Sequence, residues 1–529
     1  MKNYIFLLLA ATVLGLASCT DDLNQKPVTD STVDAETVYA TTQGYKQVLA
    51  KIYASYVIAG QEQGGGNADL TSNTGYDFLR CYFNMQEAAT DEMAATWLSG
   101  DFITNLTYMS WDANDVYVAD TYYRAYYTIA LCNEFLSHAT EEAAAQDADI
   151  KDYRAEARFL RALSYYYVLD LYGQGPFVDE TTGIGNYTPD CYTNAQLFEY
   201  IKTELDAIVA DGLHDYTQCE YGRASRQAAQ SLLAKLCLNA EVYGAGNHYA
   251  DCLAYCHAVM NAGYTLEQDY YKLFNADNDK RTNEIIFSFV VDATNTVSWG
   301  ATTYIVCGQC GNSSTQDPAK YGLTGGWGMF RVRGELPALF DQDGSDKRFM
   351  FYTDGQEQWF TKSIDDQSQG FFGEKFSNLT DAGEAASNTQ AVGADIDYPV
   401  FRLADIYLMA AEAILRGASL TADGVTYDVN KAVELVNKVR ARAYGDEDHG
   451  VNSGQLTLQY LLDERGRELY WESTRRTDLI RFGQFTGGSY KWQWKGGILD
   501  GRSTSSRYNV YPIPTAELSA NPNLHNANY

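Results

Sequence analysis

The chain has 529 residues, enough for one large domain or a few fused modules. It carries 69 acidic against 39 basic residues, a formal net charge of −30. A nucleic-acid binder needs a basic surface to neutralise phosphates, so this balance argues against that class of function. An anionic membrane surface repels such a chain as well, so attachment to a membrane needs an anchor other than charge.

The first residues predict secretion. Met1 and Lys2 precede an apolar run from Tyr4 to Leu16, which is shorter than the about 20 residues that span a bilayer. Leu16-Ala17-Ser18-Cys19 resembles the lipobox of bacterial lipoproteins, in which the Cys becomes the first residue and carries lipid. An ordinary signal peptide with an incidental Cys is the alternative.

We therefore expect a signal peptide over residues 1–18, lipid on Cys19 and a polar tether over 19–32. Thr20-Asp21-Asp22 resembles the surface-export signal of Bacteroidetes lipoproteins. The expected location is the outer membrane, at the cell surface and anchored by lipid.

Periodic apolar residues predict a helical protein. Between 152 and 172 they recur at spacings of three and four, and Gly173, Gly175 and Pro176 end the pattern. Several helices form pairs with short turns and with Ala at the expected contacts, which resembles tetratricopeptide units. The other predicted helices span about 35–59, 116–138, 194–211, 225–243, 248–262, 401–416, 429–443 and 455–473.

The middle of the chain has a different composition. Residues from about 267 to 398 are rich in Gly, Asn, Asp, Ser and aromatics, and only Ile285–Val291 is typical of a short strand. Gly60–Gly75 is a second predicted loop. A long loop-rich insertion usually carries function, although loose insertions without a role would look the same. We expect one domain over 33–529 that includes this insertion.

Cysteine usage gives no clear metal signal. Cys132, Cys237, Cys252 and Cys256 lie on helical patterns, where Cys is usually a small buried hydrophobe. Cys307-Gly-Gln-Cys310 has a metal-binding spacing but lacks a second pair, and the chain has only six His. The expectation is therefore no metal and no cofactor.

Four segments in this order resemble the SusD/RagB family of Bacteroidetes outer-membrane glycan-binding lipoproteins. They are RAEARFLRALSYYYVLDLYGQGPF (154–177), YPVFRLADIYLMAAEAIL (398–415), DERGRELYWESTRRTDLIRFGQF (463–485) and YPIPTAELSANPNLHNANY (511–529). The resemblance implies a mainly α fold with tetratricopeptide-type helix pairs as scaffold and a loop-rich ligand-binding face with few short strands. It also implies capture of a glycan and its delivery to a SusC-like TonB-dependent barrel, without catalysis.

Sugar rings stack on exposed aromatic planes and their hydroxyls need polar partners, so we searched for both. Trp327, within Gly325-Gly326-Trp327-Gly328, and Trp97, in a Gly-ending loop, are expected to be exposed, with Trp299 close by in sequence. For Trp111 and Trp471 we expect core packing.

The resemblance to the starch-binding branch of the family implies the same site. Arg80 matches an Arg that binds sugar hydroxyls, and Trp97, Tyr304 and Trp327 match aromatics that stack on the glucan. Ala95 and Gly100 stand where that branch has a further Trp and an Asn, so we expect a glycan other than plain starch. The Gly-rich loop offers two further candidate ligand residues, Asn67 and Asp69.

Other functions remain open at this point. A glycoside hydrolase needs two carboxylates about 5–10 Å apart, and the candidate acids are Asp91-Glu92 and Asp365-Asp366. Glu468 and Glu472, one helical turn apart and with Glu472 near Arg475 and Arg476, are expected to form structural ion pairs. A peptide- or protein-binding importer subunit of RagB type is the third hypothesis.

Overall fold

The computed structural model describes residues 34–60, 69–70, 74–98, 100–182, 188–341, 343–387, 393–527 and 529. The predicted signal peptide, Cys19, the tether and Asn67 lie outside these residues, as does most of the predicted loop Gly60–Gly75.

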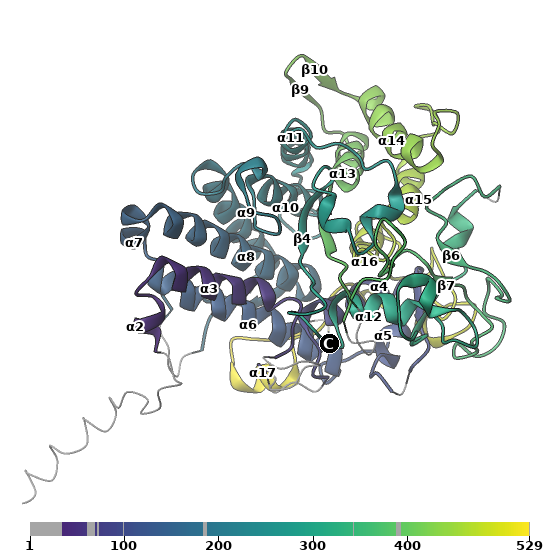
Figure 1. Cartoon of the computed structure of the whole chain (residues 1–529), viewed down its shortest axis with the longest axis horizontal. Coiled ribbons are helices and arrows are strands. Elements are labelled where there is room, and N and C mark those ends of the chain that lie inside the picture. Colours follow the sequence, from purple (N-terminus) through teal and green to yellow (C-terminus); the bar gives the residue numbers. More distant parts are fainter. Residues whose placement is uncertain are drawn as a thin grey trace, which may run out of the picture.

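The fold is mainly helical, as the sequence predicts (Figure 1). Successive long helices pack against one another: α6 on α8, α8 on α9, α10 on α11, α11 on α13, and α13 on α14. Their bounds are α3 Thr42–Ala54, α6 Val116–His138, α8 Ala148–Tyr172, α9 Asn194–Ala210, α10 Arg226–Leu238, α11 Tyr249–Met260, α13 Leu403–Leu415 and α14 Val429–Tyr444. The shorter ones are α2 Ala35–Val38, α4 Phe78–Glu87, α5 Thr104–Thr107, α7 Glu141–Gln146, α12 Ala301–Gln309, α15 Leu458–Leu469, α16 Arg475–Arg481 and α17 Thr515–Ala520.

Local signals set the ends of these helices. The Asp147 side chain accepts hydrogen bonds from the first turn of α8, and Gly173 ends that helix in the left-handed conformation, with φ of 68°. Buried on nearly every side, α8 places Tyr165, Tyr166 and Tyr167 in the core. These three of the chain's 42 Tyr therefore serve helix packing.

The described strands are short and pair in twos, always antiparallel. Ile285–Phe289 forms β4, close to the predicted strand, and pairs with β8. The insertion also contains α12, a helix that the sequence analysis missed. The strands are β1 Met93–Ala95, β2 Gln174–Pro176, β3 Cys191–Thr193, β4 Ile285–Phe289, β5 Phe330–Val332, β6 Phe351–Tyr352, β7 Phe372–Gly373, β8 Tyr398–Arg402, β9 Leu420–Ala422 and β10 Val425–Tyr427.

The C-terminal segment packs back onto the body. The Tyr511 amide donates to the Leu171 carbonyl over 2.7 Å, and the Thr515 amide donates to Ala113 over 2.9 Å. The predicted core indoles of Trp111 and Trp471 are both fully buried.

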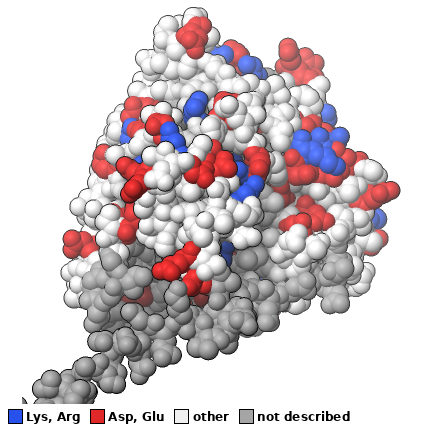
Figure 2. Space-filling view, turned by 60° about the vertical axis from the view of Figure 1, so that its left-hand side comes forward, with Lys and Arg blue, Asp and Glu red and all other residues white. Residues whose placement is uncertain are grey.

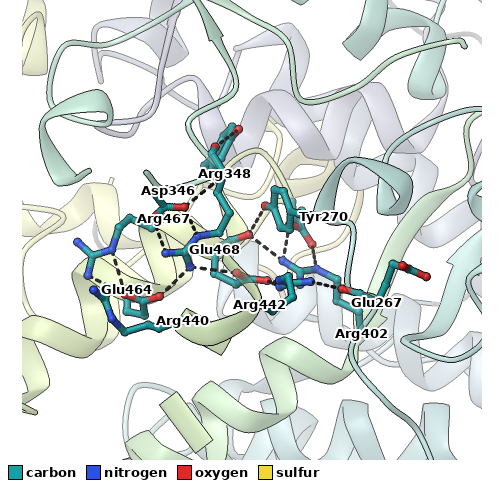
Figure 3. Close-up of polar contacts among 12 residues, drawn as sticks. Glu267, Tyr270, Asp346, Arg348, Arg402, Arg440, Arg442, Glu464, Arg467 and Glu468 are labelled. Carbon is teal, nitrogen blue, oxygen red and sulfur yellow. Dashed lines mark hydrogen bonds and ion pairs between the residues drawn. The ribbon is translucent and has the colours of Figure 1, made fainter. Parts of the chain in front are cut away.

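A buried charge cluster connects β8, α14 and α15 with the insertion (Figure 3). Its centre is Glu468, which pairs with Arg348 at 3.1 Å and with Arg402 at 2.5 Å, and also with Arg442. Burial alone would raise the pKa of Glu468, but these three guanidinium groups lower it to about 2. The cluster comprises Glu284, Arg348, Lys375, Arg402, Arg440, Arg442, Glu464, Glu468 and Glu472.

The predicted partners of Glu472 were wrong. The helix ends at Leu469, and Trp471 and Ser473 take left-handed backbone angles of 60° and 55° in φ, so the i,i+4 geometry is lost. Glu472 instead pairs with Lys375 at 2.7 Å and Arg402 at 2.6 Å. The prediction that these acids are structural, however, agrees with their burial.

Candidate functional site

Four aromatic side chains lie on segments that hydrogen bonds join to one another, and we call them the aromatic patch: Trp97, Phe102, Trp299 and Trp327. Trp97 and Trp299 are each 46% exposed and Phe102 is 51% exposed, whereas Trp327 is half-buried. The ring centroids of Trp299 and Trp327 lie 6.0 Å apart at an interplanar angle of 40°. Large rings left open to solvent in this way are typical of a binding surface.

Backbone pairing brings Trp97 and Trp327 to the same region. Just after β1, the Thr96 amide donates to the Met329 carbonyl over 2.8 Å, and its hydroxyl donates to Gly328 over 2.9 Å. The Trp327 amide donates to the Cys307 carbonyl of α12 over 2.7 Å. A side chain at Gly326 would collide with the carbonyl of Gly311, so this glycine permits a close backbone approach.

Asp77 joins the helices that carry the other parts of the site. Its carboxylate caps α4 through the Arg80 amide at 2.9 Å and accepts from the Ser298 hydroxyl at 2.8 Å. It also accepts from the Ala301 amide, at the start of α12. A side chain at Gly300 would overlap Asp77, so only glycine fits this approach. Trp299 is thereby fixed relative to α4.

Arg80 lies beneath the patch and is 3% exposed. Its guanidinium donates to the Trp299 carbonyl and to Asp101, both over 2.5 Å, and its centre lies 3.4 Å from the Tyr76 ring centroid. Burial lowers the pKa of Arg80, but Tyr117 and Asp101 raise it above its usual value, so the group stays charged. Arg80 supports Trp299 and is nearly fully buried, and its predicted role as a donor to sugar hydroxyls stays a prediction.

Tyr304 is fully buried in α12, all of whose residues are buried. Its ring lies 4.1 Å from the Arg80 guanidinium, and its hydroxyl donates to Asn84 over 2.9 Å. The expectation that this ring offers a free stacking face is therefore wrong for this structure. Tyr304 instead forms part of the floor under Arg80.

Asp69 lies apart from these contacts. Its carboxylate accepts from Lys51 of α3 over 3.3 Å, and its amide donates to Ala59 over 3.0 Å. Within the described residues, no hydrogen bond or ion pair joins Asp69 to the aromatic patch. Its predicted ligand contact stays a prediction, as does that of Asn67.

The candidate hydrolytic acids are poorly placed for catalysis. Asp91 and Glu92 are each 1% exposed, and Asp91 is held by Arg475 at 2.7 Å and by the Tyr490 hydroxyl at 2.7 Å. Burial raises the pKa of Glu92 to about 8. Asp366 accepts from Ser368 in a local turn over 2.7 Å. Neither pair forms an open site in which two carboxylates could flank a glycosidic bond.

The surface agrees with the acidic composition. Figure 2 shows acidic side chains spread over one face, with basic side chains in smaller groups. Away from the patch, a cavity of about 420 Å³ is lined by α3, Tyr221 and Val290. None of the described helices combines the length and apolar character needed to cross a bilayer.

The sequence analysis missed Phe102 and left Trp299 outside its candidate residues. The signal for Trp299 is the glycine that follows it. Gly300 approaches Asp77 too closely for any side chain, and α12, which begins next, is buried, so the backbone at Trp299 is tightly packed. Phe102 has no comparable signal: it has a positive φ of 57°, which sequence pattern does not reveal.

Two family models match the chain: "SusD family" over residues 360–529 and "Starch-binding associating with outer membrane" over 29–238. The starch-binding protein SusD of Bacteroides thetaiotaomicron is 32% identical over 98% of this chain and 96% of its own. The SusD-like protein P25 of Formosa agariphila is 25% identical over 98% and 96%.

Solved structures share the fold. Surface glycan-binding protein A from Bacteroides thetaiotaomicron, in complex with laminarihexaose, aligns with a TM-score of 0.69 at 19% identity, over 92% of this chain and 99% of its own. The corresponding protein from Bacteroides fluxus aligns with the same TM-score and identity, over 91% and 97%.

Proposed function

Because the chain belongs to the SusD family, we propose that it binds a glycan at the aromatic patch and does not cleave it. The relatives named above include a starch-binding protein and, among the structures that share the fold, one solved in complex with laminarihexaose. The observation that carries the proposal is the pair of adjacent indoles of Trp299, which is 46% exposed, and Trp327, which is half-buried.

The chemistry of the patch suits a sugar chain. The C–H faces of a pyranose stack on indole planes, and tilted rings follow a chain whose successive residues turn. Arg80 and Asp101 form an ion pair below the patch, so the charge of Arg80 is not free to select an anionic sugar. Hydrogen bonds from the protein to sugar hydroxyls replace hydrogen bonds to water with little net gain in free energy. Dissociation constants of roughly micromolar to millimolar are therefore expected.

The cellular setting is part of the same proposal. The signal peptide over 1–18 and lipid on Cys19 would hold the protein at the outer-membrane surface, and a SusC-like TonB-dependent barrel would receive the glycan. Lipid labelling of cells that express the parent and Cys19→Ala tests the anchor, since only the parent should take up label. Copurification of a barrel with the parent from solubilised outer membranes tests the partner.

Calorimetry against laminarihexaose, maltohexaose and a panel of plant, host and microbial polysaccharides tests the binding site. Trp299→Ala and Trp327→Ala should each weaken binding of the best ligand about tenfold or more, since each removes one stacking plane. Trp359→Ala is the matched control, because this indole is 42% exposed but lies against Gly334. Equal binding by all four proteins would refute the site, and release of reducing sugar by the parent would refute binding without cleavage.

A further inference from the structure

Three side chains of different chemistry meet where α10 and α11 turn back on each other. Cys237 is the penultimate residue of α10, His248 immediately precedes α11 and Asp251 lies in its first turn. One ligand atom from each lies within 4.8 Å of both others. Thiolate, imidazole and carboxylate are the donors that zinc binds in proteins.

His248 is directed toward this cluster by its surroundings. It occupies the N-cap of α11, where Ser, Thr, Asp or Asn usually caps the helix, but its side chain makes no capping hydrogen bond. Instead Nδ1 lies 2.6 Å from Asp251 Oδ2, and the imidazole packs against Phe198, with ring centroids 5.0 Å apart. The Asn247 side chain accepts from the Tyr249 amide over 3.1 Å at this helix end. The imidazole of His248 is instead held beside a carboxylate and a thiol.

We propose that Cys237, His248 and Asp251 form a zinc site with water as the fourth ligand. In tetrahedral zinc coordination, a nitrogen ligand and an oxygen ligand lie about 3.3 Å apart. The Nδ1 of His248 and the Oδ2 of Asp251 are now 2.6 Å apart, so they have to move apart by less than 1 Å. Coordination displaces the Cys237 thiol proton to solvent and requires the neutral imidazole of His248 to carry its proton on Nε2, so that Nδ1 is free to bind; no electron is transferred. This departs from the expectation of a metal-free chain.

Access and the neighbouring charges are compatible with this site. Cys237 is fully buried, whereas the side chains of His248 and Asp251 are 24% and 49% exposed, so an ion reaches the thiol from the solvent side. The nearby carboxylate of Asp206 is already held by Lys202 at 2.7 Å and by the Tyr255 hydroxyl at 2.6 Å. That carboxylate is therefore left out of the ligand set. A bound ion would link the end of α10 to the start of α11.

The test uses the full chain after treatment with a chelator. Cobalt(II), a spectroscopic substitute for zinc, should produce a thiolate-to-cobalt charge-transfer band, and zinc should abolish it. Cys237→Ser should remove the band, and His248→Gln and Asp251→Asn should each weaken zinc binding in calorimetry by about tenfold or more. The control is Cys132→Ser, which changes a buried Cys of α6 and should behave as the parent.

A second measurement distinguishes loss of the zinc site from misfolding of a variant. Zinc should raise the thermal unfolding midpoint of the parent and of Cys132→Ser by the same amount, and that of Asp251→Asn, whose changed side chain is half exposed, by clearly less. A parent without a charge-transfer band overturns the proposal. So does a band that persists in Cys237→Ser, since this would place the metal at another thiol.

Discussion

The aromatic patch and the buried charge cluster use opposite kinds of residue in opposite places. The patch leaves indoles open to water, where they contribute little to folding, whereas the cluster takes arginines and glutamates out of water entirely. Burying charges is costly unless every one is paired, so the cluster tolerates little change. The patch can vary its rings without unfolding the protein. Under the proposed function, ligand choice and fold are therefore expected to depend on separate residues.

Removing Glu468 should produce the largest loss of stability. Glu468→Ala leaves Arg402 and Arg442 buried with fewer acidic partners, so we expect the free energy of unfolding to fall by about 3–5 kcal/mol. Urea denaturation measures this. Glu434→Ala breaks the exposed pairs with Lys431 and Lys438 and should cost less than about 1 kcal/mol. Similar losses in both variants would contradict the contrast between buried and exposed charge.

Acid should destabilise the protein through the same buried carboxylates. The pKa values of Glu468 and Asp478 are lowered to about 2 by arginines that outweigh the effect of burial, whereas unfolded Glu and Asp titrate near pH 4. The unfolded chain therefore binds more protons below about pH 5, and stability present above that pH is lost as the pH falls toward 2.

Urea midpoints at pH 7, 4 and 3 measure this dependence. Glu468→Gln should show a shallower fall of stability with acid than the parent, because one carboxylate with a lowered pKa is gone. An equal slope in the two proteins would show that other groups govern acid unfolding.

Arg80 shares a property with each region: it is buried, like the charge cluster, and it supports Trp299 of the aromatic patch. Arg80→Ala leaves Asp101 buried without its counter-ion, so we expect a loss of about 3 kcal/mol in unfolding free energy together with weaker glycan binding. Trp299→Ala should weaken binding while stability stays within about 0.5 kcal/mol of the parent. If Arg80→Ala weakens binding without destabilising the fold, Arg80 contacts the ligand and our assignment of it is wrong.

Tyr304 should give the smallest effect. Tyr304→Phe removes one buried hydroxyl whose partner is Asn84, at a cost of about 1 kcal/mol. Binding of the best ligand should stay unchanged in calorimetry, because this ring lies in the floor. A loss of affinity without a loss of stability would mean that Tyr304 becomes exposed when the ligand binds.

The sequence predicted those elements whose signals are local. Helix α6 spans Val116–His138 as the apolar spacing indicates, and the four family segments identified the fold. Helix α12 was missed because residues buried on every side leave no apolar and polar faces to read.

Contacts between distant segments were harder to predict. Glu472 meets Lys375 across 97 positions of sequence, once α15 has ended. The exposure of Trp97 and the burial of Tyr304 depend on how β1, α4 and α12 pack together. A resemblance shows which residue types occur at a site, but burial decides which of them reach the solvent.

A crystal structure of the full chain with the best-bound oligosaccharide of the panel would test the central claim most directly. Our account predicts intact sugar units stacked on Trp299 and Trp327, with Arg80 and Tyr304 still beneath them. An oligosaccharide seated elsewhere, such as in the cavity beside Tyr221, or cleaved at the site, would contradict it.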